Sequence, residues 1–135
     1  SKSAGPATRA NIDEYIEATE NGAKRFSNTT NSKVILILNP AEPPIFMQTS
    51  ISFLTNGFKI NLDKVQESTN NMISNIKKYV PGYELLVEPV IVGYDRLIVM
   101  IKVTGLGDYL PSYAGNLDII NCAAISVAES FSKSR

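Results

Sequence analysis

The stretch YELLVEPVIVGYDRLIVMIKVT, residues 83–104, predicts the centre of the fold. Two runs rich in β-branched and other apolar residues, 83–92 and 96–104, flank the segment Gly93-Tyr94-Asp95, which has the composition of a turn. Proline cannot donate a hydrogen bond to a neighbouring strand, so Pro89 predicts an irregularity or an edge in the first run. The stretch therefore predicts two strands joined as a hairpin.

The residues before the hairpin predict a helix and another strand. In the helical segment, apolar residues recur at helical spacing while polar residues fall on the opposite side. The predicted stripe is Leu62, Val65, Thr69, Met72, Ile73, Ile76, Tyr79 and Val80. Pro81-Gly82 ends this helix. Residues 45–54 predict a strand, followed by a turn at Asn56-Gly57.

The first third of the chain predicts one more helix and one more strand. Asn11 and Glu14 have the spacing of a capping box, and apolar residues at helical spacing follow as far as position 26. The run KVILILN, 33–39, is continuously apolar between its first and last residues, which predicts a strand buried on both faces. The prolines of NPAEPP, 39–44, end that strand.

The predicted order of elements is α, β, β, α, β, β, α, because a last helix is expected from about residue 116 to 132. This order predicts an α+β fold with a mostly antiparallel or mixed sheet covered by helices. A length of 135 residues suits a single domain over residues 1–135.

Composition excludes several classes of function. The 13 basic residues balance the 13 acidic ones, so no concentrated basic face is available for nucleic acid. No apolar run reaches the ~20 residues of a membrane helix. The chain has no histidine, which excludes Ser-His-Asp and Cys-His catalysis within it. The single cysteine, Cys122, fits a reducing compartment such as the cytoplasm.

Two segments are candidates for ligand contact. In SAGPATRAN, 3–11, a Gly-Pro turn, the start of a helix and Arg9 could together hold a phosphate or carboxylate. A plain turn before a helix cap explains the same residues. In the second segment, Asn116 follows Gly115 and could cap the last helix or offer its amide to a ligand. We expect no catalytic residue and no metal site, and Cys122 is interpreted as a small core residue.

The last helix has an unusual distribution of apolar side chains. They cover more than one face, which is typical of a helix buried on several sides. They are Leu117, Ile119, Ile120, Ala123, Ala124, Ile125, Val127, Ala128 and Phe131. One small domain cannot cover them all, so we expect the isolated chain to self-associate.

Four segments together resemble the C-terminal half of acylating acetaldehyde dehydrogenases. They are SKSAGPATRANIDEY at 1–15, ILNPAEPP at 37–44, YVPGYEL at 79–85 and YLPSYAGNLDI at 109–119. The resemblance implies a fold like the C-terminal domain of glyceraldehyde-3-phosphate dehydrogenase. It also implies that an N-terminal Rossmann domain, which carries the nucleotide fingerprint and the nucleophilic cysteine in the family, is missing from this chain.

The resemblance implies the activity of the full-length enzyme. Acetaldehyde, coenzyme A and NAD+ are converted to acetyl-CoA and NADH in the catabolism of aromatic hydrocarbons. The implied partners are a second subunit paired through a sheet face, the enzyme's own Rossmann domain, against which the last helix packs, and 4-hydroxy-2-oxovalerate aldolase. This domain alone is expected to be inactive.

The resemblance also implies which residues contact NAD. They are Ser3, Ala4, Gly5, Pro6, Ala7, Thr8, Arg9, Ala10, Asn11 and Asn116. The family commonly has glycine where this chain has Ala7, and alanine would resist a positive φ at that position. An alternative from another class remains open: a free-standing, non-catalytic α+β oligomerisation or binding module.

Overall fold

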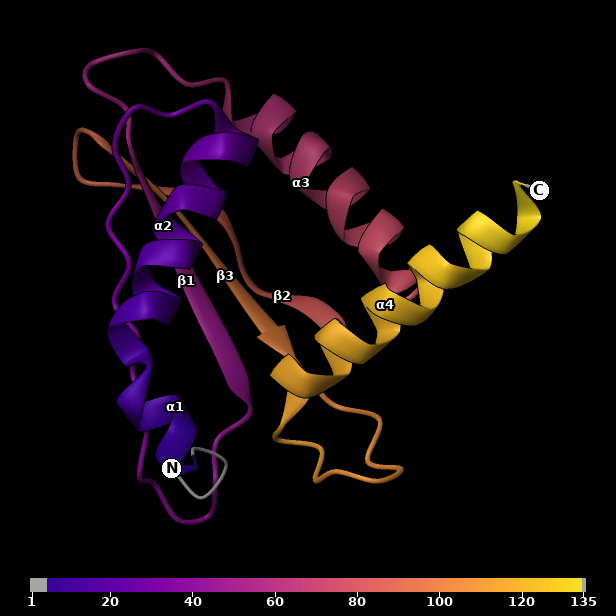
Figure 1. The fold of residues 1–135 in the computed structure, drawn as a ribbon. Coiled ribbons are helices and arrows are strands. Elements are labelled where there is room, and N and C mark those ends of the chain that lie inside the picture. The colour runs from indigo at the N-terminus through magenta and orange to yellow at the C-terminus, as the bar shows by residue number, and fades with distance from the viewer. Residues whose placement is uncertain (1–4, 135) are drawn as a thin grey trace. The chain divides into compact units, whose positions relative to one another are not determined.

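The computed structural model describes residues 5–134, and the chain divides into two compact units between residues 45 and 46. Helices α1 (Pro6–Ala10) and α2 (Ile12–Ser27) belong to the first unit. The second unit contains β1 (Met47–Leu54), α3 (Leu62–Lys77), β2 (Tyr83–Val92), β3 (Arg96–Val103) and α4 (Gly115–Lys133) (Figure 1). The described residues therefore form an α+β fold with four helices and a three-stranded antiparallel sheet, which confirms the predicted fold class.

The sheet has the strand order β1-β3-β2, so the second strand of the predicted hairpin is central. Gly93 adopts a φ of 66° in the tight connection between β2 and β3, a conformation that glycine tolerates best. The pairing of β2 with β3 shifts register between Leu85 and Val90. Pro89 lies in this interval and is fully buried, which confirms the irregularity predicted there.

One face of the sheet, the core face, carries the hydrophobic core. Every second residue of β3 from Leu97 to Val103 is buried, as expected for side chains that alternate across a strand. Val80, Ile101 and Val103 form its centre, and Ile76 of α3 packs against them. On the same face, burial raises the pKa of Tyr83, and the neighbouring Tyr79 raises it further.

The opposite face of the sheet, called the second face below, carries a row of polar side chains next to a row of apolar side chains. The register places Ser50 and Ser52 of β1 beside Met100 and Ile98 of β3, and the β2 side contributes exposed valines. The full set is Gln48, Ser50, Ser52, Leu54, Glu84, Val87, Val90, Val92, Arg96, Ile98, Met100 and Lys102. At one end, Lys102 Nζ lies 3.3 Å from Glu84 Oε1 and 4.8 Å from the centre of the Phe46 ring.

The predicted helix after residue 61 is confirmed, but fewer residues of its apolar stripe are buried than the sequence predicted. Asn61 Oδ1 accepts a hydrogen bond from the Lys64 amide at 3.1 Å and caps α3. Thr69 and Ile73 are buried, but Met72 and Tyr79, which the sequence placed in the stripe, are exposed. The helix ends at Lys77, so Tyr79 lies beyond it.

The predicted strand at residues 33–39 is not formed in the part of the chain that the structure describes. The segment is extended but pairs with no strand, and Ile35 and Ile37 are each 76% exposed. A continuous apolar run predicts burial on both faces only where neighbouring strands supply hydrogen-bond partners. None of the described residues supplies such a partner.

The predicted capping box at Asn11 and Glu14 is also wrong. Pro6 begins α1 just after Gly5, and Asn11, with φ −110° and ψ 20°, joins α1 to α2. Asn11 does occupy the N-cap position of α2, as predicted, but its side chain donates to the Ala7 carbonyl at 3.0 Å and makes no capping hydrogen bond to α2. The Tyr15 amide of α2 bonds to the Asn11 carbonyl. The predicted helix itself is confirmed over Ile12–Ser27.

Candidate functional site

The first candidate segment forms a short helix where the sequence predicted a tight turn. Gly5 caps α1, Pro6 occupies its first turn, and Arg9 lies in its last turn with an exposed side chain. Gly5, Pro6, Ala7, Ala10 and Asn11 are exposed and Thr8 is half-buried. Ser3 and Ala4 lie outside the described residues.

The helical backbone of α1 spares Ala7 the positive φ that alanine would resist. Because this residue lies inside α1, its φ is that of a right-handed helix, and a β-carbon carries no strain there. What the segment offers a ligand is therefore the exposed guanidinium of Arg9 and, one residue earlier, the half-buried Thr8. Planar guanidinium groups suit phosphate and carboxylate recognition.

The second candidate, Asn116, does not cap the last helix. Helix α4 begins at Gly115, its N-cap is Ala114, and no side chain accepts a capping hydrogen bond. Asn116 is therefore inside the first turn, exposed, and its carboxamide bonds to no described residue. The alternative in which Asn116 is a simple cap is wrong, and its amide is available to a ligand.

The start of α4 is tied to the end of the sheet by backbone contacts. The Gly105 amide bonds to the Ser112 carbonyl at 2.7 Å, and the Thr104 amide bonds to the Gly82 carbonyl at 2.9 Å. A β-carbon on Gly115 would overlap the Val103 carbonyl oxygen, so only glycine allows this close approach. Asn116 is thus held next to a rigid part of the fold.

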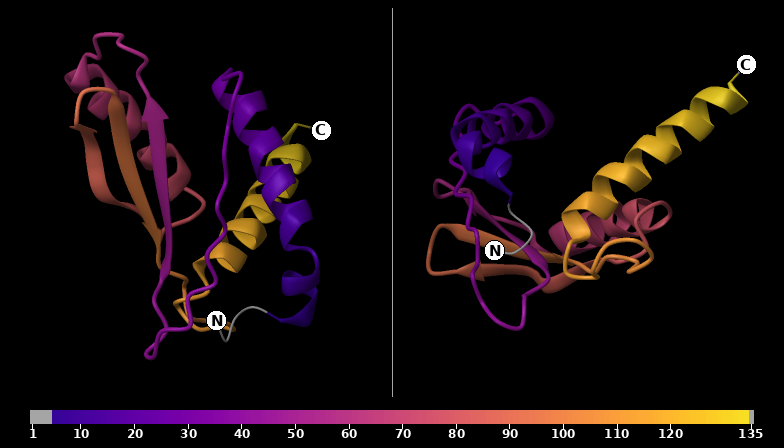
Figure 2. Two further views of the ribbon diagram at one scale, coloured as in Figure 1. Left: turned by 90° about the vertical axis from the view of Figure 1, so that its left-hand side faces the viewer. Right: turned by 60° about the horizontal axis from the view of Figure 1, so that its bottom comes forward.

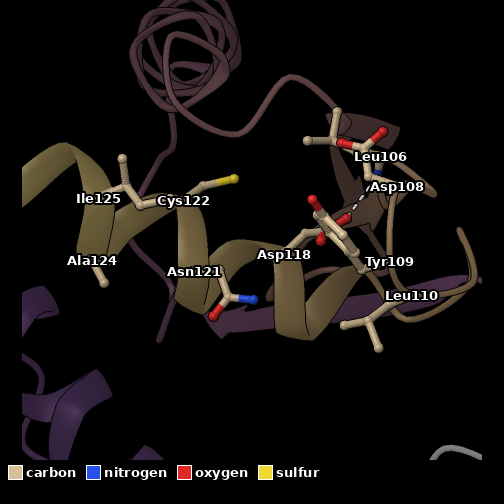
Figure 3. Close-up of a pocket in the computed structure, with 9 residues that line it drawn as sticks. All are labelled: Leu106, Asp108, Tyr109, Leu110, Asp118, Asn121, Cys122, Ala124 and Ile125. Atoms are coloured by element: carbon tan, nitrogen blue, oxygen red, sulfur yellow. Dashed lines mark hydrogen bonds between the residues drawn. The ribbon is translucent and has the colours of Figure 1, made fainter.

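Asp118 secures the same loop, a role that its sequence context did not reveal. The Leu106 amide donates to Asp118 Oδ2 at 2.6 Å, across a gap of 12 residues (Figure 3). Asp118 also lies in the first turn of α4, where a carboxylate interacts favourably with the helix dipole. Spacing alone cannot show that a loop folds back onto a carboxylate.

An open pocket of about 420 Å³ lies between this loop and α4 (Figure 3). Its lining is mostly apolar, with a few polar groups from Asp108, Asp118 and Asn121. The complete lining is Leu106, Asp108, Tyr109, Leu110, Asp118, Asn121, Cys122, Ala124 and Ile125. Cys122 is half-buried and packs against the core cluster, in agreement with its interpretation as a small core residue.

Beyond its first turns, α4 is exposed and apolar. The half-buried positions stop at Ser126, and Val127 is 70% exposed. Figure 2 shows the helix projecting away from the sheet. The predicted excess of apolar surface on this helix is therefore present. Within residues 5–134, no helix is long and apolar enough to cross a membrane, and no group of three or more His, Cys, Asp or Glu side chains could hold a metal ion.

The two candidate groups belong to different units, and each is described within its own. Arg9 and its neighbours lie in the first unit, and Asn116 lies in the second. The polar groups of both are exposed.

Comparison with known proteins gives one consistent family. Residues 1–111 match the model of the prokaryotic acetaldehyde dehydrogenase dimerisation family. The chain is 52% identical over 135 residues to an acetaldehyde dehydrogenase of Pectobacterium atrosepticum, covering 100% of this chain and 45% of that protein. It is 51% identical over 133 residues to one of Spirochaeta aurantia, covering 98% and 44%. The chain thus spans less than half the length of these relatives.

Proposed function

The chain belongs to the prokaryotic acetaldehyde dehydrogenase dimerisation family, and from this we propose that it is the dimerisation and cofactor-facing domain of a longer, cytoplasmic, NAD-dependent acylating acetaldehyde dehydrogenase. The observation that carries the proposal is sequence identity above 50%, along essentially the whole chain, to proteins named acetaldehyde dehydrogenase. Those relatives are more than twice as long, so the catalytic cysteine and the Rossmann domain would lie outside these residues.

In the complete enzyme this domain would form part of the NAD site. Arg9 and Thr8, together with Ser3, Ala4 and the rest of the segment to Asn11, would face the phosphates, and Asn116 would offer its amide. Support comes from the exposure of the Arg9 and Asn116 side chains and from the fixed start of α4. NAD+, when bound, would accept a hydride from the substrate.

The remaining chemistry would take place on groups outside this chain. A cysteine thiolate would add to acetaldehyde, loss of hydride would leave a thioester, and coenzyme A would take the acyl group and release the thiolate. Cys122 is unsuited to that role because it packs against the core. The domain itself would bind and orient the dinucleotide, form one wall of the aldehyde pocket and pair the subunits.

The second face of the sheet is the proposed dimer surface. It combines exposed valines with a serine row, and it ends in the Lys102–Glu84 ion pair. The apolar outer part of α4 would pack against the enzyme's own N-terminal domain. An aldolase partner, 4-hydroxy-2-oxovalerate aldolase, would bind the complete enzyme, which would act in aromatic catabolism.

The isolated chain is expected to have no acylating dehydrogenase activity. It contains no histidine, and its single cysteine is half-buried against the core cluster. The assay is NADH formation from acetaldehyde, NAD+ and coenzyme A. Turnover comparable to that of a full-length relative, abolished by Cys122→Ser, would contradict the proposal and favour an independent catalyst.

In the full-length enzyme, Asn116→Ala and Arg9→Ala are expected to raise the Michaelis constant for NAD+ about tenfold or more while leaving stability within about 0.5 kcal/mol. Both side chains are exposed, and Asn116 caps nothing. The measurements are steady-state kinetics with NAD+ as the variable substrate, and thermal unfolding.

Asn121→Ala is a matched control for Asn116→Ala, because Asn121 is also exposed and lies on the same helix. It should leave both quantities unchanged. Variants that lose stability but keep normal kinetics would show that the two residues serve folding only. A start codon at or near Ser1 in the gene would favour the alternative, a free-standing oligomerisation module.

A further inference from the structure

Two consecutive backbone amides after β3 tie the loop that follows it to the region where α4 begins. The Gly105 amide donates to the Ser112 carbonyl at 2.7 Å. The Leu106 amide donates to Asp118 Oδ2 at 2.6 Å, so its acceptor is a side chain (Figure 3). A hydrogen bond to a carboxylate is stronger than one between neutral groups. Asp118 therefore joins this loop firmly to the first turn of α4.

The backbone at Gly105 leaves room for the carboxylate. This residue is buried, and a β-carbon on it would lie 2.6 Å from Asp118 Oδ2 and 3.2 Å from the Ser112 carbonyl oxygen. Only glycine therefore lets Asp118 reach the Leu106 amide without a displacement of the loop. All of these residues belong to the second unit.

The start of α4 lacks the usual means of holding a first turn. Its N-cap is Ala114, and no side chain accepts a capping hydrogen bond. The first amides of a helix have no partner within the helix, and uncapped ends fray. Within the part of the chain that the structure describes, Asp118 is the residue of this turn whose side chain forms a hydrogen bond. That bond takes the place of a cap.

Asn116 lies two residues before Asp118 and on a different side of α4. Two residues of an α-helix are turned by about 200° relative to each other, so the two side chains point in nearly opposite directions. Asn116 is exposed, whereas Asp118 is half-buried. Asp118 can therefore hold the turn from the side of the loop while the Asn116 carboxamide stays on the exposed side.

We propose that Asp118 is a positioning residue for the cofactor, which fixes the direction of the Asn116 carboxamide by anchoring the first turn of α4 to the loop after β3. The inference rests on the proposed contact of Asn116 with NAD. Asp118 itself would not touch the dinucleotide. Its effect on affinity would arise because a binding group that is ordered in advance loses less conformational freedom when the ligand binds.

Two substitutions separate the anchor from the charge of Asp118. Asp118→Asn removes the charge but keeps an oxygen that can accept from the Leu106 amide, whereas Asp118→Ala removes both. In the full-length enzyme, Asp118→Ala should raise the Michaelis constant for NAD+ at least about fivefold and leave kcat within about twofold, while Asp118→Asn should keep both within about twofold. Equal Michaelis constants for the two variants would overturn the proposal, because both lose the same charge.

A double variant tests whether Asp118 acts through Asn116. In an enzyme that carries Asn116→Ala, Asp118→Ala should change the Michaelis constant for NAD+ less than about twofold, because no carboxamide remains to be positioned. The same increase in both backgrounds would overturn the proposal. If Asn116→Ala alone has no effect, the proposed NAD contact is wrong and the inference fails with it. If Asn116→Ala raises the constant and Asp118→Ala does not, the inference alone fails.

Nuclear magnetic resonance relaxation tests the anchor without cofactor, on the 135-residue chain. The backbone order parameter of Asn116 should be about 0.85 in the parent chain and in Asp118→Asn, and should fall below about 0.6 in Asp118→Ala. Gly105, which the Ser112 carbonyl holds, should stay rigid in both variants. An Asn116 that stays rigid in Asp118→Ala would overturn the proposal. Loosening of Gly105 as well would show a role in folding only, which would also overturn it.

Discussion

Replacing Gly115 with alanine is expected to destabilise the second unit by about 3 kcal/mol. The new β-carbon would overlap the Val103 carbonyl oxygen and lie 2.9 Å from Val103 Cγ1. Val103 cannot yield, because it is only 2% exposed and belongs to the core cluster. The start of α4 would have to move away from β3, which would also disturb the Asp118 contact with the loop.

Urea unfolding followed by far-UV circular dichroism measures this effect, and Gly22→Ala is the matched control. Gly22 lies inside α2, where an added β-carbon would meet no neighbouring group within 4 Å, so alanine should leave stability unchanged or raise it by up to about 1 kcal/mol. If Gly115→Ala unfolds at the same urea concentration as the parent chain, the close approach of α4 to β3 is wrong.

The second large effect is expected at the proposed dimer surface. Val90→Glu should weaken dimerisation at least about 100-fold, because a carboxylate would be buried without a partner beside Ile98. The matched control is Val127→Glu, which places the same charge on the exposed part of α4. Sedimentation equilibrium over a concentration series measures both.

The control should leave the dimer intact, because the proposed dimer surface is the second face of the sheet and does not include Val127 of α4. Dimers that persist in Val90→Glu and disappear in Val127→Glu would show that the helix pairs the subunits. The urea midpoint of each variant shows whether the fold is kept. Val90 is 40% exposed, so the charge is compatible with a folded monomer.

Local signals in the sequence predicted the second unit well. The hairpin depends on a turn that contains Gly93, and the helix before it starts at the capping residue Asn61, so neighbours in sequence determine both. The irregularity at Pro89 also follows from one residue, which lacks the amide that a ladder needs. Such features require no knowledge of the distant parts of the chain.

The errors occurred where distant residues decide the outcome. The run at 33–39 has every property of a buried strand, but a strand also needs a neighbour. Asn11 has the spacing of a cap, but Pro6 starts an earlier turn that supplies acceptors within α1. The contact of Asp118 with the Leu106 amide spans a loop whose path the sequence does not reveal. For the proposed NAD contacts, composition and spacing allowed either a ligand contact or a plain turn and helix cap. Only the family resemblance favoured the cofactor.

Sedimentation velocity on the isolated chain tests the central claim, that this is a dimerisation domain, most directly. A subunit has a mass of 14.8 kDa, and we expect a species of twice that mass that dissociates when Val90→Glu is added. A folded species of 14.8 kDa at every concentration, up to the millimolar range, would contradict the claim.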